Sequence, residues 1–277
     1  MNQSDVIEAV LEPGTEEAPE TFIRDGLLYC GKCGTPRQKR ENVYGEEIVY
    51  DCLCRCQREA REREEAERRR RDEAWRIQEL RERGLDRAYR AWTFEGDDGR
   101  EPKMEYLRRY VEKWDEVKEL GLGLLLWGDV GTGKTYGAAC IANALIERLV
   151  SCRMTNFIRV ANVLSGEGRD AKNQCIDDLV SYPLLVIDDL GAERSSEYIQ
   201  EMVFEVIDAR YRTGLPLIVT TNLTPEYLKN PEKVTYSRIY DRILEMTVPI
   251  KFTEKRRGAL HEEKLQTFRE LLGVAES

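Results

Sequence analysis

Near the middle of the chain lies a short segment that is compatible with few folds, Gly128-Asp129-Val130-Gly131-Thr132-Gly133-Lys134-Thr135. It matches the phosphate-binding loop pattern G-x-x-x-x-G-K-[ST] at every fixed position. An apolar run over residues 122–127 precedes it, as a buried strand would. Apolar side chains follow it at the three- to four-residue spacing of a helix, at Ala138, Ala139, Ile141, Ala142, Leu145, Ile146 and Leu149. The sequence therefore predicts a strand, a phosphate-binding turn and a helix in succession.

A loop of this kind can hold the phosphates of a nucleotide. Its glycines let successive backbone N–H groups turn toward a phosphate, and the positive end of the helix dipole adds to the attraction. Lys134 can reach the β and γ phosphates, and the hydroxyl of Thr135 can bind Mg²⁺. We expect residues 128–135, together with the adjoining Tyr136, to bind ATP or ADP with magnesium.

A second buried strand is predicted to deliver the acidic side of the same site. The apolar run over residues 182–187 ends in Asp188 and Asp189. Acidic residues at the end of a buried strand are what the Mg²⁺ side of a phosphate-loop site requires. We expect Asp188 to hold Mg²⁺ through water and Asp189 to orient or polarise the attacking water.

A third apolar run, over residues 215–221, ends in Asn222. The amide of Asn222 could form a hydrogen bond with the γ-phosphate or with the attacking water. Alternatively, Asn222 forms a turn and caps the next helix, a role that Thr224 could equally fill.

Two arginines in a predicted helix over residues 237–244 are also candidates. Arg238 and Arg242 are four residues apart, so they lie on one helix face. Exposed arginines usually contact only solvent. An arginine presented to a neighbouring subunit's nucleotide can, however, neutralise the charge that develops on the γ-phosphate.

Five of the eight cysteines lie close together near the N-terminus, at Cys30, Cys33, Cys52, Cys54 and Cys56. In a reducing compartment such a cluster indicates metal ligands rather than disulfides. Tetrahedral Zn²⁺ takes four ligands. We favour Cys30, Cys33, Cys54 and Cys56, with Cys52 as the alternative to one of the last two. A module of this size cannot bury a sufficient core, so the metal would supply much of its folding free energy.

Composition divides the chain into five parts. We expect an acidic, poorly ordered tail (1–28), a zinc-binding module (29–56), a charged helix or linker (57–88), a nucleotide-binding domain (89–255) and a C-terminal helix or tail (256–277). The zinc-binding module has room for a small hairpin that turns at residues 44–46.

The spacing of side chains predicts two further helices. Residues 57–83 lack proline and glycine and pair opposite charges at helical spacing. Ile77 and Leu80 near the end of this segment either belong to a solvated spacer or dock on a partner protein. Residues 102–120 predict an amphipathic core helix that ends at Gly121.

Composition also narrows the class of protein. Charged residues make up 34% of the 277 residues, and no apolar stretch has the length needed to cross a membrane. The acidic start of the chain is unlike a signal peptide, so we expect a cytoplasmic protein with no membrane contact. A net charge of −9 argues against a surface coated with basic residues for duplex DNA.

Taken in order, these segments resemble the DnaC/IstB group of AAA+ ATPases over about residues 90–255. This group includes DnaC- and DnaI-like loaders of the replicative DNA helicase and helper ATPases of some transposons. The resemblance implies an α/β fold, namely the P-loop NTPase fold of the AAA+ ASCE type. In this fold helices flank a parallel sheet, and we expect a minimal lid or no lid. It implies Walker A at residues 128–135, Walker B at Asp188 and Asp189, and sensor 1 at Asn222.

The resemblance also implies an arginine finger at Arg242, with Arg238 as its companion. Asp189 departs from the wider AAA+ pattern, which has glutamate at this position. Because the aspartate side chain is shorter, we expect slow hydrolysis that suits a switch.

The partners implied by the resemblance are a hexameric replicative helicase, single-stranded DNA and further copies of the chain. ATP bound between subunits would order an oligomer or spiral that grips single-stranded DNA, while the N-terminal module docks on the helicase. Two alternatives remain open. The first is a transposase-helper ATPase acting on duplex DNA, and the second is a zinc-stabilised adaptor with a weak ATP site.

Overall fold

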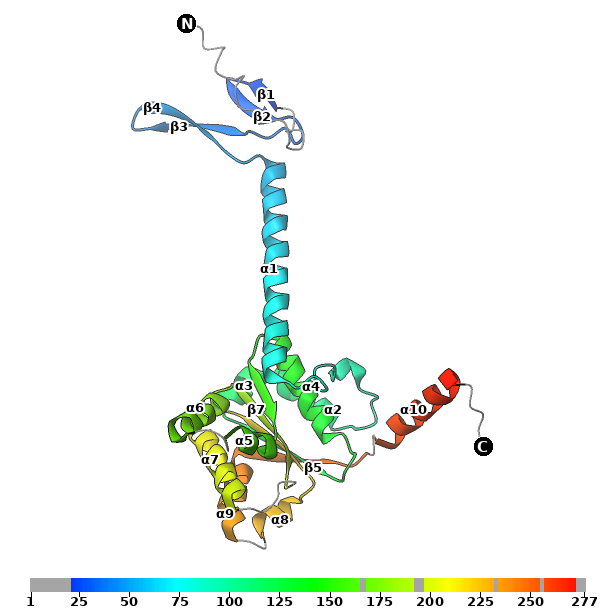
Figure 1. The fold of residues 1–277 in the computed structure, drawn as a ribbon. Helices are drawn as coiled ribbons and strands as arrows, with labels where there is room; N and C mark the ends of the chain where they lie inside the picture. The colour runs from blue at the N-terminus through cyan, green and yellow to red at the C-terminus, as the bar shows by residue number, and fades with distance from the viewer. Residues whose placement is uncertain (1–20, 165–167, 192–196, 232–233, 255–256, 273–277) are drawn as a thin grey trace. The chain divides into compact units, whose positions relative to one another are not determined.

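The computed structural model describes residues 21–164, 168–191, 197–231, 234–254 and 257–272 (Figure 1). Most of the predicted acidic tail, residues 1–20, lies outside the described residues. The chain forms two compact units, residues 1–74 and residues 75–277.

The first unit begins with a hairpin that the sequence analysis had placed in the tail. Strands β1 (Thr21–Arg24) and β2 (Leu27–Cys30) pair antiparallel. Asp25 and Gly26 join them with positive φ angles of 53° and 72°. An Asp-Gly pair that takes up this conformation is a strong hairpin signal, because its twist matches that of the flanking strands. The expectation of poor order is therefore wrong for residues 21–28.

A second hairpin confirms the predicted turn at residues 44–46. Strands β3 (Gln38–Val43) and β4 (Glu46–Asp51) pair antiparallel, and Tyr44 and Gly45 turn the chain with positive φ. Every residue of β4 and all but one of β3 are exposed. The two hairpins therefore bury too little apolar surface to stabilise themselves.

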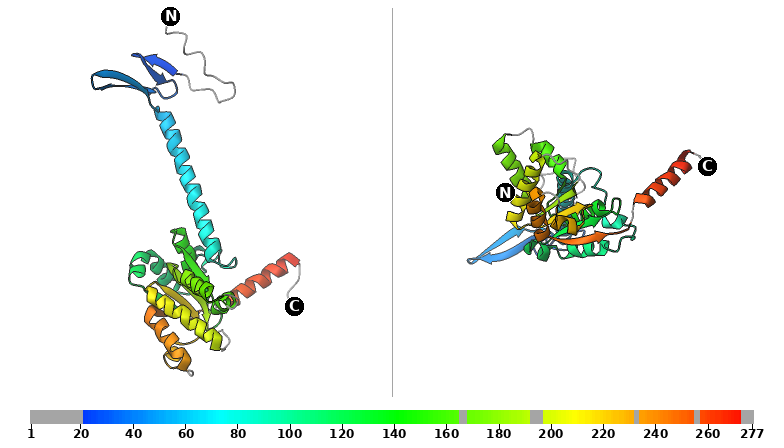
Figure 2. Two further views of the ribbon diagram at one scale, coloured as in Figure 1. Left: turned by 60° about the vertical axis from the view of Figure 1, so that its left-hand side comes forward. Right: turned by 90° about the horizontal axis from the view of Figure 1, so that it is seen from below.

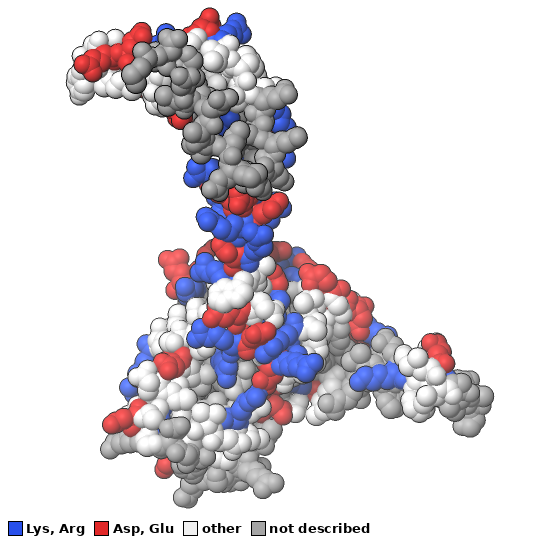
Figure 3. All heavy atoms as spheres, turned by 45° about the horizontal axis from the view of Figure 1, so that its top comes forward, with Lys and Arg blue, Asp and Glu red and all other residues white. Residues whose placement is uncertain are grey.

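Helix α1 (Arg55–Gly84) confirms the predicted charged helix. Opposite charges pair one turn apart along it, as at Arg61 and Glu65, whose side chains lie 2.9 Å apart. On the face drawn in Figure 3, basic and acidic side chains are interspersed rather than gathered into one patch. Ile77 and Leu80, near the end of the helix, pack against the core of the second unit. They are therefore not free to dock on a partner protein.

Within the described part of the second unit, five strands form one parallel sheet in the order β6-β7-β8-β5-β9. Helices of this unit surround the sheet (Figures 1 and 2). These strands are β5 (Gly123–Gly128), β6 (Cys152–Thr155), β7 (Leu184–Leu190), β8 (Leu217–Thr221) and β9 (Thr247–Phe252). Because helices follow the strands along the chain, both faces of the sheet can be covered. The predicted α/β class is confirmed.

Helices pack on both faces of this sheet. The helical segments are η1 (Phe94–Gly96), α2 (Met104–Glu112), α3 (Trp114–Glu119), α4 (Lys134–Glu147), α5 (Phe157–Leu164), α6 (Arg169–Val180), α7 (Glu197–Thr213), α8 (Pro225–Lys229), α9 (Val234–Met246) and α10 (Arg257–Leu272). Side chains alternate along β5: Leu124 and Leu126 join the core formed with α2, α3 and α4, whereas Leu125 joins the core formed with α5, α6, α7 and α9.

The predicted amphipathic helix over residues 102–120 is interrupted. It divides into α2 and α3 at Lys113, where φ and ψ are −94° and 21°. The predicted apolar face is nevertheless buried on both sides of the break, with Leu107 at 0% and Trp114 at 2% exposure. Gly121 has a φ of 63° and ends the segment as the predicted C-terminal cap.

The C-terminal end of α1 lies against the edge strand β6. A Cβ atom on Gly84 would lie 2.1 Å from the carbonyl oxygen of Cys152, so only glycine allows this approach. Arg153 of β6 donates to the carbonyl of Arg83, and Arg159 of α5 pairs with Asp86. These contacts anchor the end of α1 to the sheet.

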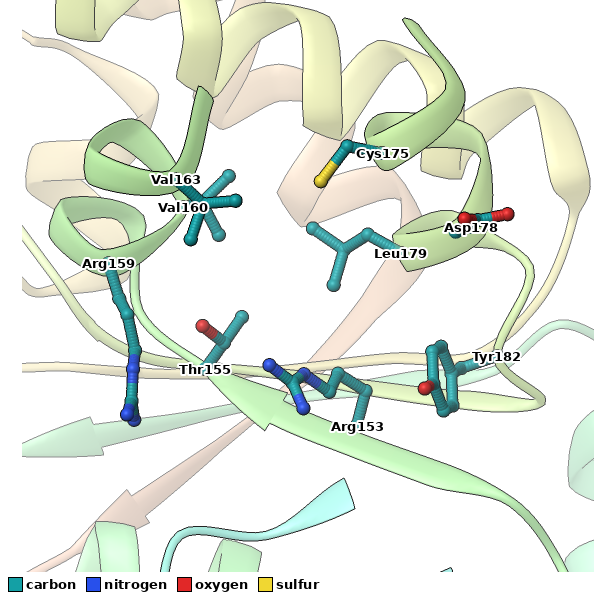
Figure 4. A pocket seen from close by; sticks show the side chains of 9 residues that line it. All are labelled: Arg153, Thr155, Arg159, Val160, Val163, Cys175, Asp178, Leu179 and Tyr182. Carbon is teal, nitrogen blue, oxygen red and sulfur yellow. The ribbon is translucent and has the colours of Figure 1, made fainter. Parts of the chain in front are cut away.

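A pocket of about 290 Å³ adjoins this edge, between α5 and α6 (Figure 4). Val160, Val163 and Leu179 line its helical side, and Arg153 and Arg159 lie nearer β6. The pocket contains none of the predicted nucleotide-binding residues. No helix among the described residues is long and apolar enough to cross a membrane.

Candidate nucleotide-binding and zinc-binding sites

The phosphate-binding loop joins the end of β5 to the start of α4. Gly133 stands at the N-terminus of α4 with a φ of 91°, a conformation that residues with a side chain rarely adopt. A Cβ atom on Gly128 would lie 2.2 Å from the carbonyl oxygen of Phe252 in β9. The two glycines therefore allow the loop to turn and to lie close to the neighbouring strand.

Lys134 connects this loop to the end of β8. Its Nζ donates hydrogen bonds to the carbonyls of Gly128 and Asp129 at 2.8 and 2.7 Å, and to Oδ1 of Asn222 at 2.8 Å. The residue is only 7% exposed, and burial lowers the pKa of its ammonium group. The structure therefore brings two of the predicted site residues, 88 positions apart, into direct contact.

The predicted magnesium ligands also lie together. Thr135 Oγ1 donates a hydrogen bond of 2.8 Å to Oδ1 of Asp188. Burial raises the pKa of the Asp188 carboxyl, and hydrogen bonds from Thr220 and Thr135 act in the opposite direction. A hydroxyl and a carboxylate beside the loop fit the preference of Mg²⁺ for hard oxygen ligands.

Asp189 differs from its neighbour in exposure and in backbone conformation. Its side chain is exposed, whereas Asp188 is buried, and its φ of 59° lies in the left-handed region. The register of β7 against β8 shifts here, because Ile187 pairs with Val219 but Leu190 pairs with Thr221. Such bulges are common beside active sites, where they change the direction of a side chain.

Thr220 lies opposite this bulge and was not singled out from the sequence. It is 1% exposed, and its hydroxyl contacts both Asp188 and Asp189. The signal that could have indicated it is a pair of hydroxyl residues, Thr220 and Thr221, at the end of an otherwise apolar strand, directly before Asn222.

The structure separates the roles of Asn222 and Thr224. The hydroxyl of Thr224 accepts a hydrogen bond from the backbone N–H of Tyr227, so Thr224 is the N-terminal cap of α8. The side chain of Asn222 contacts Lys134 instead. The amide is thus placed beside the loop, where a sensor of the nucleotide would lie.

The two candidate arginines of α9 have different surroundings. Arg238 is exposed. Arg242 pairs with Asp208 of α7, and its guanidinium stacks over the rings of Phe204 and Tyr211 at 4.9 and 5.7 Å. An arginine finger at Arg242 stays a prediction, and it would require this ion pair to open.

Tyr136 lies in the first turn of α4, directly after the loop. Its hydroxyl donates to the carbonyl of Thr93 at 2.7 Å, and its ring packs beside Trp92. Phe94 is 6% exposed and belongs to the core. Contact between Tyr136 and a nucleotide stays a prediction.

Four thiols lie together in the first unit. The sulfur atoms of Cys30, Cys33, Cys54 and Cys56 all lie within 4.8 Å of one another. Sulfurs bound to one tetrahedral Zn²⁺ at about 2.3 Å would be about 3.8 Å apart, so this arrangement fits the ion. Cys52 lies outside the cluster, where its sulfur contacts the carbonyl of Pro36 at 3.5 Å.

The thiols of this cluster differ in acidity. The hydroxyl of Thr35 lowers the pKa of Cys33 to about 5. The hydrogen bond shared with Cys54 raises the pKa of Cys56 to about 12. Without metal the cluster therefore retains protons, which binding of Zn²⁺ by four thiolates would release.

A parallel sheet with this loop after β5 and paired carboxylates on β7 defines a P-loop NTPase fold of the AAA+ type. Comparison with protein families agrees, since the sequence model of the IstB-like ATP binding protein family matches residues 61–253. The chain belongs to this family of ATP-binding proteins.

Similar proteins include the replicative helicase loader DnaI of Bacillus subtilis, 28% identical over 175 residues, or 58% of this chain and 55% of that protein. A Mycobacterium tuberculosis protein named for ATP binding in an insertion sequence is 29% identical over 129 residues, 46% of this chain and 51% of its own. The crystal structure of DnaI matches at 29% identity and a TM-score of 0.50, over 62% of this chain and 94% of the solved chain. The chain spans about half the length of these two relatives.

Proposed function

We propose that the protein is an ATP-dependent loader of a replicative DNA helicase, and that ATP binding and slow hydrolysis act as its oligomerisation switch on single-stranded DNA. The observation that carries the proposal is the direct contact of Lys134 with Asn222 beside Thr135 and Asp188. Such a site can distinguish a nucleotide that has a γ-phosphate from one that lacks it. The similarity to the B. subtilis helicase loader supports the helicase as partner.

The chemistry at this site follows from four side chains. Lys134 would exchange its contacts with the loop carbonyls for the β and γ phosphates, which changes its contact with Asn222. Thr135 and Asp188 would hold Mg²⁺, which neutralises phosphate charge when bound. Asp189, exposed at the bulge, would orient the attacking water. Because its side chain is short, turnover would be slow.

The remaining parts of the chain would supply the partners. We assign helicase docking to the N-terminal zinc-binding module and the single-stranded DNA contact to the oligomer of ATPase domains. In this proposal the zinc-binding module comprises residues 29–56, and the ATPase domain comprises residues 89–255. We also place the protein in the cytoplasm, where its partners lie.

The first test mixes the full-length protein with the hexameric replicative helicase of its host and measures the mass of the product by light scattering after gel filtration. We expect a stoichiometric complex, and ATP turnover that rises with single-stranded DNA. Absence of a helicase complex would contradict the proposal.

The same measurements distinguish the alternatives. A transposase helper, which the similarity to the insertion-sequence protein favours, would oligomerise on duplex DNA with ATP and would not bind the helicase. A zinc-stabilised adaptor would bind its partner equally well after Lys134→Ala and would show no DNA-stimulated turnover.

Alanine at Arg242 or Arg238 is expected to preserve ATP affinity but to reduce oligomer-dependent turnover by about 1,000-fold or more, because arginine fingers act on the charge of the transition state. Turnover as a function of protein concentration measures this effect. Arg212→Ala is the matched control, since Arg212 also pairs with Asp208 but its side chain is 76% exposed. Normal turnover in the Arg242→Ala variant would eliminate the finger assignment.

A further inference from the structure

The bulge in β7 creates a backbone group that the sheet does not pair. Between the pairs Ile187–Val219 and Leu190–Thr221, two residues of β7, Asp188 and Asp189, face the single residue Thr220. A bulge of this kind interrupts the regular ladder and leaves its extra residue unpaired. The N–H of Asp189 therefore needs an acceptor outside the ladder, because every backbone N–H group is a strong hydrogen-bond donor.

The hydroxyl of Thr220 supplies that acceptor and acts on the other carboxylate as well. It accepts a hydrogen bond of 2.9 Å from the N–H of Asp189 and donates one of 2.6 Å to Oδ1 of Asp188. The first bond holds Asp189 in its left-handed conformation, with a φ of 59° that is unfavourable for a residue with a side chain. The second orients the carboxyl that also accepts from Thr135.

We propose that Thr220 is a positioning residue that fixes both carboxylates of the nucleotide site through one hydroxyl group. This inference rests on the proposed ATPase activity and adds a determinant to it. Thr220 is 1% exposed and its hydroxyl is engaged on both sides, so it acts through Asp188 and Asp189. Asp188 sets the affinity for Mg²⁺, and Asp189 sets the position of the attacking water.

The adjoining residue provides a matched control. Thr221 is equally buried, at 0% exposure, but its hydroxyl donates to the carbonyl of Leu190 and accepts from the N–H of Leu223. Valine at either position removes one buried hydroxyl from the same strand with little change in volume. Only the change at Thr220 removes contacts with the carboxylates.

The test compares full-length Thr220→Val, Thr220→Ser and Thr221→Val with the unchanged protein. Binding of a fluorescent ADP analogue is titrated with Mg²⁺, and ATP turnover is measured at saturating Mg²⁺. We expect Thr220→Val to need about tenfold more Mg²⁺ and to lose about 10- to 100-fold in kcat, because a hydrogen bond to a charged group is lost. Nucleotide affinity in the absence of Mg²⁺ should not change. Serine should restore both properties.

Three outcomes would overturn the inference. The first is a Thr220→Val protein with unchanged Mg²⁺ dependence and kcat. The second is an equal effect of Thr221→Val, which would indicate general loss of stability, as thermal unfolding of the variants would show. The third is nucleotide binding by the unchanged protein that does not depend on Mg²⁺. Because these assays contain neither helicase nor DNA, failure of the loader function would leave their result intact.

Discussion

Replacing Lys134 with alanine should reduce the affinity for ATP by at least about 100-fold and abolish turnover. Lys134 is 7% exposed, and the three hydrogen bonds of its ammonium group direct it to the space between the loop and Asn222. Charge-assisted hydrogen bonds to phosphate are among the strongest polar contacts in proteins, and alanine removes all of them at once. Isothermal titration calorimetry with ATP and magnesium measures the loss.

Lys251→Ala is the control for this experiment. Lys251 is an exposed lysine on the edge strand β9 and lies 5.0 Å from the ring centre of Trp127. Its loss also removes one positive charge from the second unit, but none of the predicted nucleotide-binding residues changes, so ATP affinity should change less than about twofold. Equal heats of binding for Lys134→Ala and the unchanged protein would disprove the site.

Removing zinc should unfold the N-terminal unit and leave the nucleotide-binding unit folded. Within the described residues of the first unit, Cys30 and Cys54 are the only side chains that belong to the buried core. Structural zinc supplies about 10–16 kcal/mol of apparent binding free energy in small metal-dependent modules, far more than these hairpins gain by burial. After chelation, limited proteolysis should cut within residues 21–54, while the affinity for ATP persists.

Single substitutions identify the zinc ligands. Cys56→Ser should lose the metal, because its sulfur lies within the cluster, whereas Cys52→Ser should retain about one zinc per chain, measured by elemental analysis of protein prepared without chelator. The reverse pattern would contradict the assignment. Less than half an equivalent of zinc in the unchanged protein would remove the site altogether.

The fold could be predicted wherever local spacing carried the information. The strand, loop and helix around Gly128–Thr135 formed as expected, because glycine positions and apolar periodicity act over a few residues. The tail expected over residues 1–28 is too long, because Asp25-Gly26 forms a hairpin turn within it. The break at Lys113 could not be read from a pattern that continues on both sides of it.

The residues of the candidate site could be predicted only in part from local sequence patterns. Asp188 and Asn222 could be named because each ends an apolar run. Thr220 was missed, since its role depends on a register shift between β7 and β8 that neither strand encodes alone. The pairing of Arg242 with Asp208 was hidden for a similar reason, because it depends on how α7 and α9 pack.

The chemistry available to this protein follows from its sequence: a phosphate-binding loop, carboxylates that follow a buried strand, and thiols spaced for a tetrahedral ion. Such patterns are local, so they persist in any fold that keeps the segment intact. Which of these groups lie in contact depends on the three-dimensional fold. It placed Cys52 outside the thiol cluster and put the Lys134 ammonium against Asn222. Contacts between distant residues depend on strand order and register, and these follow from the packing of the whole sheet.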